Sequence, residues 1–392
     1  MADTTTRAHF EPEHEAFRES FAAFVAKELA PDYLQWEKDG IAPRWIFTKA
    51  GEYGFTGMSV PEQYGGGGSD DFRFNQVIAE VLADAAIGGA GLGVTLHNDI
   101  LTPYFVEYCN DEQSARWLPG IARGELITAI AMTEPGTGSD LASVGTTAVR
   151  DGDVYVLNGS KTFITNGINS DLVIVVAKTD PTQRHTGMSL LVVERGMDGF
   201  ERGRNLDKVG LHSQDTAELF FTDVRVPAAN LLGEEGKGFA YLTNNLAQER
   251  LSIAVTGVAS ARAALRWTVD YVKERKAFGQ PLSAFQNTKF VLAEVTTAVD
   301  VAQAYVDQCV LKLNAGTLTA AEAAQAKYWC TELQQSAVDK CLQLFGGWGY
   351  MWEYPICRAY ADARIVKIAG GSIEIMKTII ARDMFKGKLG RK

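Results

Sequence analysis

The sequence has few cysteines and no excess of positive charge. Its five cysteines are odd in number and none forms a C-x-x-C pair, which argues against a disulfide scaffold or a zinc site and favours a reducing compartment.

There are 38 lysines and arginines against 48 aspartates and glutamates, so the net charge is −10. This balance argues against a broad grip on nucleic acid or anionic lipid, but it leaves room for a local basic pocket that holds a phosphorylated cofactor.

Long hydrophobic runs are also missing. No stretch approaches the ~18 apolar residues that are needed to cross a bilayer. The N-terminus lacks the basic and apolar regions of a secretory signal, and it is too acidic for an organelle transit peptide. We therefore expect a cytoplasmic protein with no membrane span.

Three familiar patterns of binding or catalysis do not occur. The histidines are scattered and none pairs at metal-ligand spacing, so we expect no metal site. No G-x-S-x-G elbow is present, which leaves a serine hydrolase unsupported. The glycine-rich stretches at 65–68 and 88–91 lack the G-x-G-x-x-G spacing after a strand. They are better interpreted as a flexible loop and a close approach of two helices.

The residues that are present divide the chain into three zones. A length of 392 residues suggests two or three domains of ~150 residues each. Residues 1–124 are helical in pattern, with apolar residues at near-helical spacing over 17–29 until Pro31 ends the series. Residues 125–235 hold short β-rich runs, and residues 236–392 return to long helices. We expect a mostly α fold with an N-terminal helical domain, a central antiparallel β-barrel or sandwich, and a C-terminal four-helix bundle.

Turn dipeptides separate the β-rich runs of the middle zone. Four Asn-Gly or Asp-Gly pairs, at 151–152, 158–159, 166–167 and 198–199, are typical of hairpin turns. Runs this short, with no helical pattern between them, indicate an antiparallel sandwich or barrel rather than a parallel sheet.

Three long helices are expected in the last zone. The first runs from about Lys237 to Arg275 and the second covers residues 285–313. Thr319 and Glu322 form a capping-box pattern that starts the third, which ends at two glycines, 346–347. Long antiparallel helices with short loops indicate the four-helix bundle.

One loop of the middle zone is dense in hydroxyl groups, glycine and free backbone N–H groups. It covers residues 132–140 and follows a β-rich run. Such a loop can present backbone donors to an anionic or carbonyl-rich ligand. By itself, a simple Pro-Gly turn is the more economical interpretation.

Glu249 is the most informative single residue. It continues a helical series of apolar residues between Leu246 and Ile253, so a carboxylate lies on the apolar stripe of its helix. Burial would raise its pKa, which suits a general base. A glutamate paired with a nearby arginine, such as Arg250, explains the pattern equally well.

Six motifs resemble the acyl-CoA dehydrogenase family, in the family's order and along almost the whole chain. They read MTEPGTGSD from Met132, NGSKTFITNG from Asn158, QDTAELFFTDVRVP from Gln214, ERKAFGQPLSAFQ from Glu274, QLFGGWGYMWEYP from Gln343 and IAGGSIEIMKTIIARDM from Ile368. The resemblance implies α,β-dehydrogenation of a fatty acyl-CoA to trans-2-enoyl-CoA, as in fatty acid β-oxidation. A carboxylate removes the α-proton, and N5 of FAD accepts the β-hydrogen as hydride. Hydrogen bonds from a flavin ribityl hydroxyl and a backbone N–H stabilise the thioester oxygen.

The resemblance also assigns FAD contacts. On the side of the middle zone they are Ile130, Met132, Thr133, Ser139, Phe163 and Thr165. Across a subunit boundary they are Arg275, Phe278, Gln286, Gln343, Gly346 and Gly347, and the pyrophosphate-binding segment holds Ser372 and Glu374. Substrate contacts are implied for Ser139, Tyr241, Arg250 and Gly371. Phe163 stands where many members carry tryptophan, which still permits stacking.

The usual position of the base departs from the family pattern. Most members carry a catalytic glutamate in the last motif, where this chain has Gly370. The long-chain and isovaleryl branches place the base on the earlier helix, in a motif that resembles residues 248–250 here. We therefore expect Glu249 to be the base, Gly370 to offer its backbone N–H, and open space to lie beside the missing side chain. The last motifs resemble the long-chain branch most, and isovaleryl-type substrates stay open.

The resemblance implies partners as well as chemistry. Because FAD would be shared between subunits, we expect a homotetramer built as a dimer of dimers, with electron-transfer flavoprotein as the acceptor. Two other interpretations are a non-catalytic FAD-binding subunit and an acyl-CoA oxidase. The retained Glu249 disfavours the first, and the short chain disfavours the second.

Overall fold

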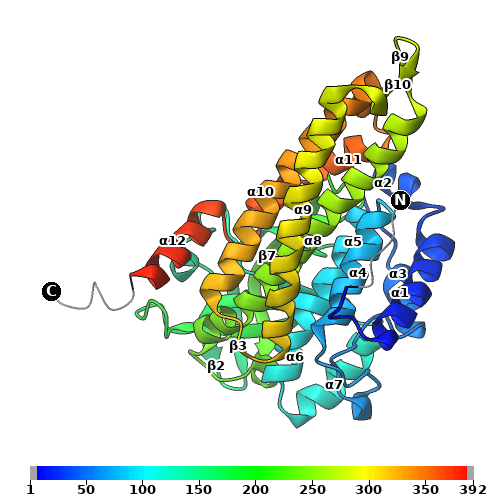
Figure 1. Cartoon of the computed structure of the whole chain (residues 1–392). Helices are drawn as coiled ribbons and strands as arrows, with labels where there is room; N and C mark the ends of the chain where they lie inside the picture. The colour runs from blue at the N-terminus through cyan, green and yellow to red at the C-terminus, as the bar shows by residue number, and fades with distance from the viewer. Residues whose placement is uncertain (1–6, 386–392) are drawn as a thin grey trace.

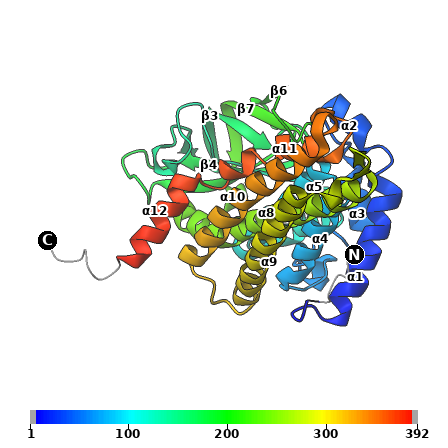
Figure 2. The same ribbon diagram turned by 45° about the horizontal axis from the view of Figure 1, so that its top comes forward.

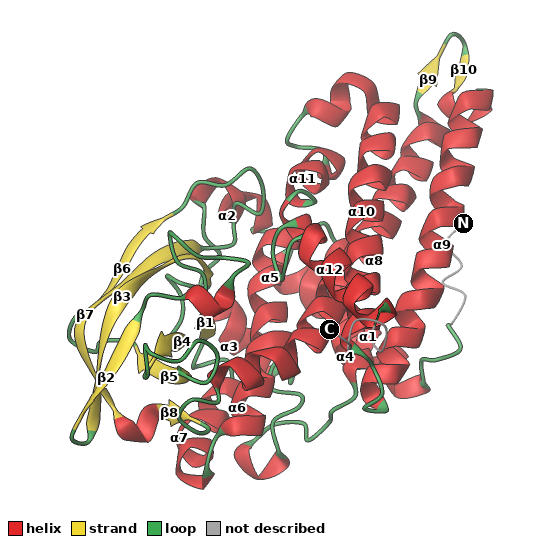
Figure 3. Cartoon of the chain, turned by 90° about the vertical axis from the view of Figure 1, so that its left-hand side faces the viewer, coloured by secondary structure: helices red, strands yellow, loops and turns green. Residues whose placement is uncertain are grey.

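The computed structural model describes residues 7–385 and has helical, β and helical parts in the predicted order (Figure 1). The two helical parts lie against each other and the sheet lies to one side of them (Figure 3). The mostly α fold with a central β domain is therefore confirmed. No helix among the described residues is both long and apolar enough to cross a membrane.

The N-terminal part consists of short helices around a cluster of aromatic side chains. The helices are α1 (Pro12–Phe24), α2 (Tyr33–Asp39), α3 (Trp45–Glu52), α4 (Phe72–Asp84), α5 (Gly88–Thr95), α6 (Thr102–Tyr108) and α7 (Asp111–Ala122). Two π-helical turns, η1 (Val25–Leu29) and η3 (Leu96–Leu101), extend α1 and join α5 to α6. The Asp71 carboxylate accepts the backbone N–H of Arg73 at 3.0 Å, which caps α4.

The middle part is one sheet. Its strands are β1 (Thr128–Ala131), β2 (Thr147–Asp151), β3 (Val154–Thr165), β4 (Leu172–Lys178), β5 (Met188–Glu194), β6 (Phe200–Asn205), β7 (Thr216–Pro227) and β8 (Leu231–Leu232). They follow the order β6-β7-β3-β2-β4-β5-β8, with β1 beside β4. Most neighbours are antiparallel, as predicted, but β1 and β2 each pair with β4 in parallel.

The sheet curls so that β4 is buried on both faces. Ile174 and Val176 belong to a core shared with helices α6 and α7. Val173 and Val175 belong to a second core, shared with residues of β3 and β7. Burial on both faces explains why β4 is a continuous apolar run rather than an alternating one.

One of the four expected turns is wrong. The pair 158–159 lies inside β3, at an irregularity in its pairing with β7. A Cβ on Gly159 would lie 2.4 Å from Oγ1 of Thr146, so glycine is needed there for a close approach between strands. The pair 151–152 forms the expected turn between β2 and β3, and Gly152 has a φ of +63°.

The C-terminal part is built on the three predicted long helices. They are α8 (Gly238–Glu274), α9 (Gln286–Asn314) and α10 (Ala320–Phe345), and a hairpin of β9 (Lys276–Ala277) and β10 (Gln280–Pro281) joins the first two. The predicted capping box at Thr319 and Glu322 is present. Two shorter helices, α11 (Pro355–Asp362) and α12 (Ile373–Met384), pack against α10. Figure 2 shows α8 and α10 at the centre of the molecule, between the sheet and the N-terminal helices.

Candidate active site

Glu249 lies in the first third of α8, on the stretch that faces α6. Its side chain is buried, with only 4 % of its surface exposed. The hydroxyl of Tyr104, on α6, donates a hydrogen bond to Oε1 of Glu249 at 2.9 Å. Burial raises the pKa of Glu249 to about 7, although the Tyr104 hydrogen bond and the Arg250 charge oppose that rise. A carboxyl group with this pKa is well placed to accept a proton near neutral pH.

The alternative of a paired glutamate is not supported. Among residues 7–385 no lysine, arginine or histidine forms an ion pair with Glu249, and Arg250 acts on it only through its nearby charge. Oε2 of Glu249 makes no hydrogen bond with any described residue. One carboxylate oxygen is therefore held by Tyr104, and the other stays available for a ligand.

Unsatisfied polar atoms flank the Tyr104–Glu249 pair. The amide nitrogen of Asn245, one helical turn before Glu249, is buried without a partner. The same holds for the hydroxyl of Tyr108, one turn after Tyr104, and for Nε of Arg250. Buried donors without acceptors are costly in a finished interior, so three of them around one carboxylate indicate a place for a polar ligand. The ring of Tyr108 stacks on Tyr241, with 4.0 Å between ring centroids, which brings another predicted substrate residue to this cluster.

The Gly370–Gly371 turn packs on the same stripe of α8. It lies between η8 (Ile365–Lys367) and α12, with φ values of +66° and +94° that favour glycine. A Cβ on Gly370 would lie 2.3 Å from Cδ1 of Ile253, which is one turn beyond Glu249. The expectation of open space beside Gly370 is therefore wrong, because Ile253 fills it. The backbone N–H groups of both glycines donate to no acceptor within residues 7–385, so the turn offers free donors.

The predicted flavin residues of the sheet gather at the end of β3 and the loop after β1. Phe163 is 67 % exposed and has a φ of +60°, which is strained for a bulky side chain. It lies where the pairing between β3 and β7 shifts register, and such a bulge re-aims a side chain. Thr165 ends the same strand, and Met132 and Thr133 are half-buried beside it. An exposed aromatic ring held in this conformation fits a flat cofactor ring.

The loop at residues 132–140 is held from beneath by a buried lysine. Nζ of Lys161 donates to the carbonyl of Met132 at 3.0 Å and to Oε1 of Glu134 at 2.9 Å. Burial lowers the pKa of Lys161 to about 8. Glu134 also accepts hydrogen bonds from two backbone N–H groups, those of Gly145 and Thr146. Ser139 is exposed, and the Cβ positions of the loop glycines 136 and 138 are open, so the backbone there is accessible to a ligand.

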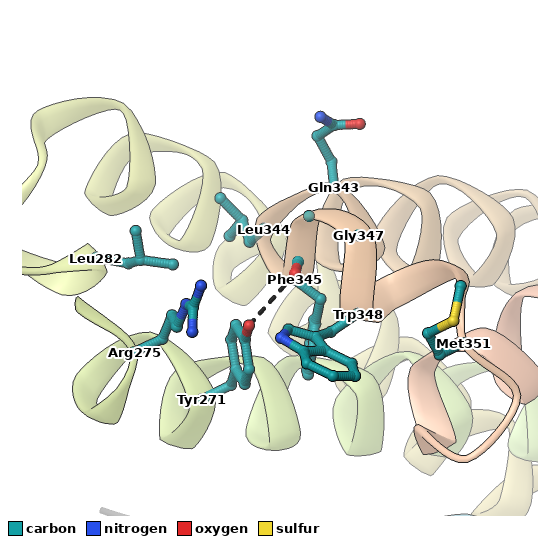
Figure 4. Close-up of a pocket in the computed structure, with 10 residues that line it drawn as sticks. Tyr271, Arg275, Leu282, Gln343, Leu344, Phe345, Gly347, Trp348 and Met351 are labelled. Carbon is teal, nitrogen blue, oxygen red and sulfur yellow. Dashed lines mark hydrogen bonds between the residues drawn. The ribbon is translucent and has the colours of Figure 1, made fainter. Parts of the chain in front are cut away.

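A pocket of about 560 Å³ lies at the far end of the bundle, where α8 and α10 finish (Figure 4). Its walls include Arg275, Gln343, Gly346 and Gly347, which the resemblance assigns to FAD. The hydroxyl of Tyr271 donates to the carbonyl of Phe345 at 3.3 Å and ties the two helix ends together. The sequence analysis did not assign a role to the aromatic residues of this pocket, which are Tyr271, Phe345 and Trp348.

The remaining predicted flavin residues fall into two places. Phe278 is at the tip of the β9–β10 hairpin and is 96 % exposed, and Gln286 starts α9. Figures 1 and 3 both show this hairpin projecting away from the sheet, so one chain does not bring Phe278 to Phe163. Ser372 caps α12 through its hydroxyl, and Glu374 is exposed in the first turn of that helix. Ile130 is half-buried on β1.

Sequence reasoning missed two residues that support the site. Tyr104 is part of no motif, and its contact with Glu249 joins helices that are far apart in the chain. Lys161 belongs to a motif, but its side chain points into the interior. Successive side chains of a strand point to opposite faces, so its direction depends on which residues of β3 face inward. Within the described part of the chain, no group of three or more histidine, cysteine or carboxylate side chains could hold a metal ion.

The geometry agrees with what this chain resembles among known proteins. Family models describe the N-terminal, middle and C-terminal domains of acyl-CoA dehydrogenases, and they match residues 11–125, 129–224 and 236–385. The mitochondrial long-chain specific acyl-CoA dehydrogenase of Sus scrofa is 48 % identical over 99 % of this chain and 90 % of its own length.

Solved structures extend the likeness to three dimensions. An acyl-CoA dehydrogenase from Geobacillus kaustophilus has a TM-score of 0.93 and 50 % identity, covering 96 % of this chain and 99 % of its own. An acyl-CoA dehydrogenase from Bacillus anthracis, solved in complex with FAD, has a TM-score of 0.90 and 32 % identity, covering 98 % of this chain and 69 % of its own. The chain therefore belongs to the acyl-CoA dehydrogenases, FAD-dependent oxidoreductases that act on the CH–CH bond of an acyl-CoA.

Proposed function

We propose that the chain oxidises a fatty acyl-CoA to its trans-2-enoyl-CoA, with Glu249 as the base that removes the α-proton. The observation that carries this assignment is the buried carboxyl group of Glu249, held by Tyr104 and raised in pKa to about 7. A general base works best when its pKa is close to the working pH. Gly370, at the family's usual position of the base, has no side chain to compete with it.

The substrate loses a proton from the α-carbon and a hydride from the β-carbon, and a double bond forms between the two. FAD, when bound, supplies the acceptor for that hydride. The exposed ring of Phe163, with Thr165 and the loop that begins at Met132, would hold its ring system from the sheet. Arg275 and Phe278 would hold the other end of a cofactor bound mainly by a neighbouring copy.

The thioester oxygen gains negative charge as the α-proton leaves. Preorganised N–H donors stabilise such a charge, and one donor contributes ~10²–10³ in rate. The free backbone N–H groups of Gly370 and Gly371 are candidates for this role, since the turn is half-buried and packs beside the stripe that carries Glu249. The unpartnered Nε–H of Arg250 can donate a hydrogen bond to a carbonyl or phosphate oxygen of the substrate's CoA part.

We propose a long, unbranched acyl chain as the substrate. The identity of 48 % to a long-chain specific relative supports this choice. Isovaleryl-CoA is the competing substrate. Anaerobic mixing of the holoenzyme with acyl-CoAs of increasing length tests both, because flavin bleaching reports reduction directly. We expect the fastest bleaching with long straight chains. Faster bleaching with isovaleryl-CoA would reverse the substrate assignment, and no bleaching with any acyl-CoA would favour a non-catalytic FAD-binding subunit.

The proposal includes a homotetramer and electron-transfer flavoprotein as the electron acceptor. The β9–β10 hairpin, which carries Phe278, projects away from the sheet (Figures 1 and 3), and this supports the shared cofactor site on which the tetramer rests. Light scattering of the holoenzyme is expected to give four copies, and a stable monomer with full FAD content would contradict this. Reoxidation of the substrate-reduced enzyme by electron-transfer flavoprotein, compared with oxygen, separates a dehydrogenase from an oxidase.

A further inference from the structure

Lys327 is a fully buried lysine that the reaction described so far does not use. It lies on α10, its side chain is 0 % exposed, and no carboxylate of residues 7–385 forms an ion pair with it. Its Nζ donates a hydrogen bond to the backbone carbonyl of Gly371 at 2.6 Å. Buried lysines are rare and normally form an ion pair with a carboxylate. A buried lysine whose ammonium group donates only to one carbonyl oxygen therefore requires an explanation.

The turn that Lys327 holds is otherwise poorly constrained. Two consecutive glycines with positive φ have wide conformational freedom. Three helices meet at them: Ile253 of α8 lies against Gly370, Met376 of α12 lies against Gly371, and Lys327 of α10 grips the Gly371 carbonyl. The first two contacts are apolar and have no direction. Within residues 7–385, the hydrogen bond from Lys327 is the one contact that fixes the orientation of a peptide group in the turn.

The charge of Lys327 lies in the same neighbourhood as the proposed chemistry. Arg250, the neighbour of Glu249 on α8, is close enough to act on it. Burial, with help from that Arg250 charge, lowers the pKa of Lys327 to about 8, so the group is still cationic at neutral pH. A cation beside this turn favours negative charge on a nearby thioester oxygen.

Stability alone does not account for this lysine. A methionine fills a similar volume without the cost of burying an ammonium group, and the half-exposed Gly371 carbonyl can be satisfied by water. We propose that Lys327 is a positioning residue, which holds the Gly370–Gly371 turn in the conformation whose free N–H groups receive the thioester oxygen. This inference rests on the proposed function, because it assigns a task to a turn beside the proposed base.

The test compares Lys327→Met and Lys327→Arg with Lys340→Met in the FAD-loaded full chain. Lys340 is on the same helix, but its side chain is 42 % exposed and pairs with Glu294. Four properties are measured: melting temperature, FAD content, affinity for an enoyl-CoA product, and acidity of a 3-thia-acyl-CoA. That analogue can lose its α-proton but has no β-hydrogen to give up, and its enolate is seen as a long-wavelength absorption band. The pH midpoint of the band reports how well the site stabilises the enolate.

We expect Lys327→Met to keep its melting temperature, FAD and product affinity. We also expect the band midpoint to move up by at least ~1 pH unit and flavin bleaching to slow by at least ~30-fold, the scale on which oxyanion donors act. Lys327→Arg keeps a cationic donor and should recover part of both losses, while Lys340→Met should match the wild type.

Two results would overturn the positioning role. One is an unchanged band midpoint in Lys327→Met. The other is a joint loss of folding, FAD and product binding in both Lys327 variants, which would mark a purely structural lysine. A wild-type protein that shows neither the band nor bleaching would instead overturn the proposed function, and the assignment of Lys327 with it.

Discussion

Two buried lysines hold two loops of the candidate site, and they are built differently. Lys161 holds the loop at 132–140 from within the β domain and pairs with a carboxylate, Glu134, at 2.9 Å. Lys327 holds the turn at 370–371 from the helical bundle and has only a carbonyl oxygen as its partner. In the first case the lysine compensates a charge that the fold has already buried. In the second, no carboxylate of the described residues forms an ion pair with the lysine. The comparison suggests that the first lysine serves stability and the second serves the reaction.

The comparison assumes that both loops serve one base, and Glu249→Gln tests that assumption. The change keeps the shape and the Tyr104 contact but removes the proton acceptor. We expect FAD binding to persist while flavin reduction by acyl-CoA falls by at least ~10³-fold, the scale of general-base loss. Rapid anaerobic mixing measures the rate. Reduction at a near-normal rate would show that another residue is the base.

The stability half of the comparison is tested by Lys161→Met. The change leaves the Glu134 carboxylate without its cationic partner, and the side chain of Glu134 is only 10 % exposed. We therefore expect a loss of ~3–5 kcal/mol in the free energy of unfolding. Denaturant unfolding of the apoprotein measures it. Adding Glu134→Gln should restore part of the loss, because the stranded charge disappears. A loss in Lys161→Met no larger than in Lys327→Met would remove the distinction between the two lysines.

The position of Gly370 gives a third test, which the structure has sharpened. A glutamate there cannot be tested alone, since Ile253 occupies the space its side chain needs. We therefore combine Glu249→Gly, Ile253→Ala and Gly370→Glu. Relative to Glu249→Gly with Ile253→Ala, we expect flavin reduction to recover by ~10-fold. Recovery will be incomplete, because a φ of +66° costs a residue other than glycine ~1–2 kcal/mol. A triple variant that folds, binds FAD and shows no recovery would mean that the two positions do not share one α-carbon.

The smallest effect is expected from Tyr104→Phe. Its hydrogen bond lowers the pKa of Glu249, so its removal should raise that pKa further above the ordinary value for glutamate. The base must be ionised to act, so the rise of the reduction rate with pH should shift to higher pH by ~1 unit, with a loss of ~5-fold near pH 7 that is regained at higher pH.

Tyr305→Phe is the control for this pH profile. Tyr305 is on α9, and its hydroxyl donates a hydrogen bond to Oε1 of Gln325 at 2.8 Å and not to Glu249. We expect its pH profile to match that of the wild type. An equal shift in both variants would argue against a specific role of the Tyr104 hydrogen bond.

The sequence predicted those features that depend on local pattern. The capping box at Thr319 and the ends of α8 follow from residues a few positions apart, and both are present. The burial of Glu249 followed from the helical spacing of its apolar neighbours. Each of these needs only the geometry of one element, which a single stretch of sequence carries.

The features that were missed depend on how distant elements meet. Tyr104 reaches Glu249 from another domain, and Ile253 fills the space beside Gly370 from a different helix. The pair 158–159 has the composition of a turn, yet it lies at an irregularity within β3, close to Thr146, the residue before β2. No local pattern distinguishes these outcomes, because the deciding contact is made by a residue outside the segment concerned.

The single helix α8 has a consequence for which mutations the protein can tolerate. Glu249 lies near its beginning and Arg275 at its end, so the helix separates them by about 39 Å at ~1.5 Å per residue. Deleting one residue between them would rotate one end of the helix against the other by ~100°. Either the Glu249 carboxyl group or the Arg275 side chain would then point away from its site. Point substitutions in the middle of α8 preserve that phase. We therefore expect deletions and insertions between residues 254 and 270 to abolish activity, whereas exposed point substitutions in the same stretch should preserve it.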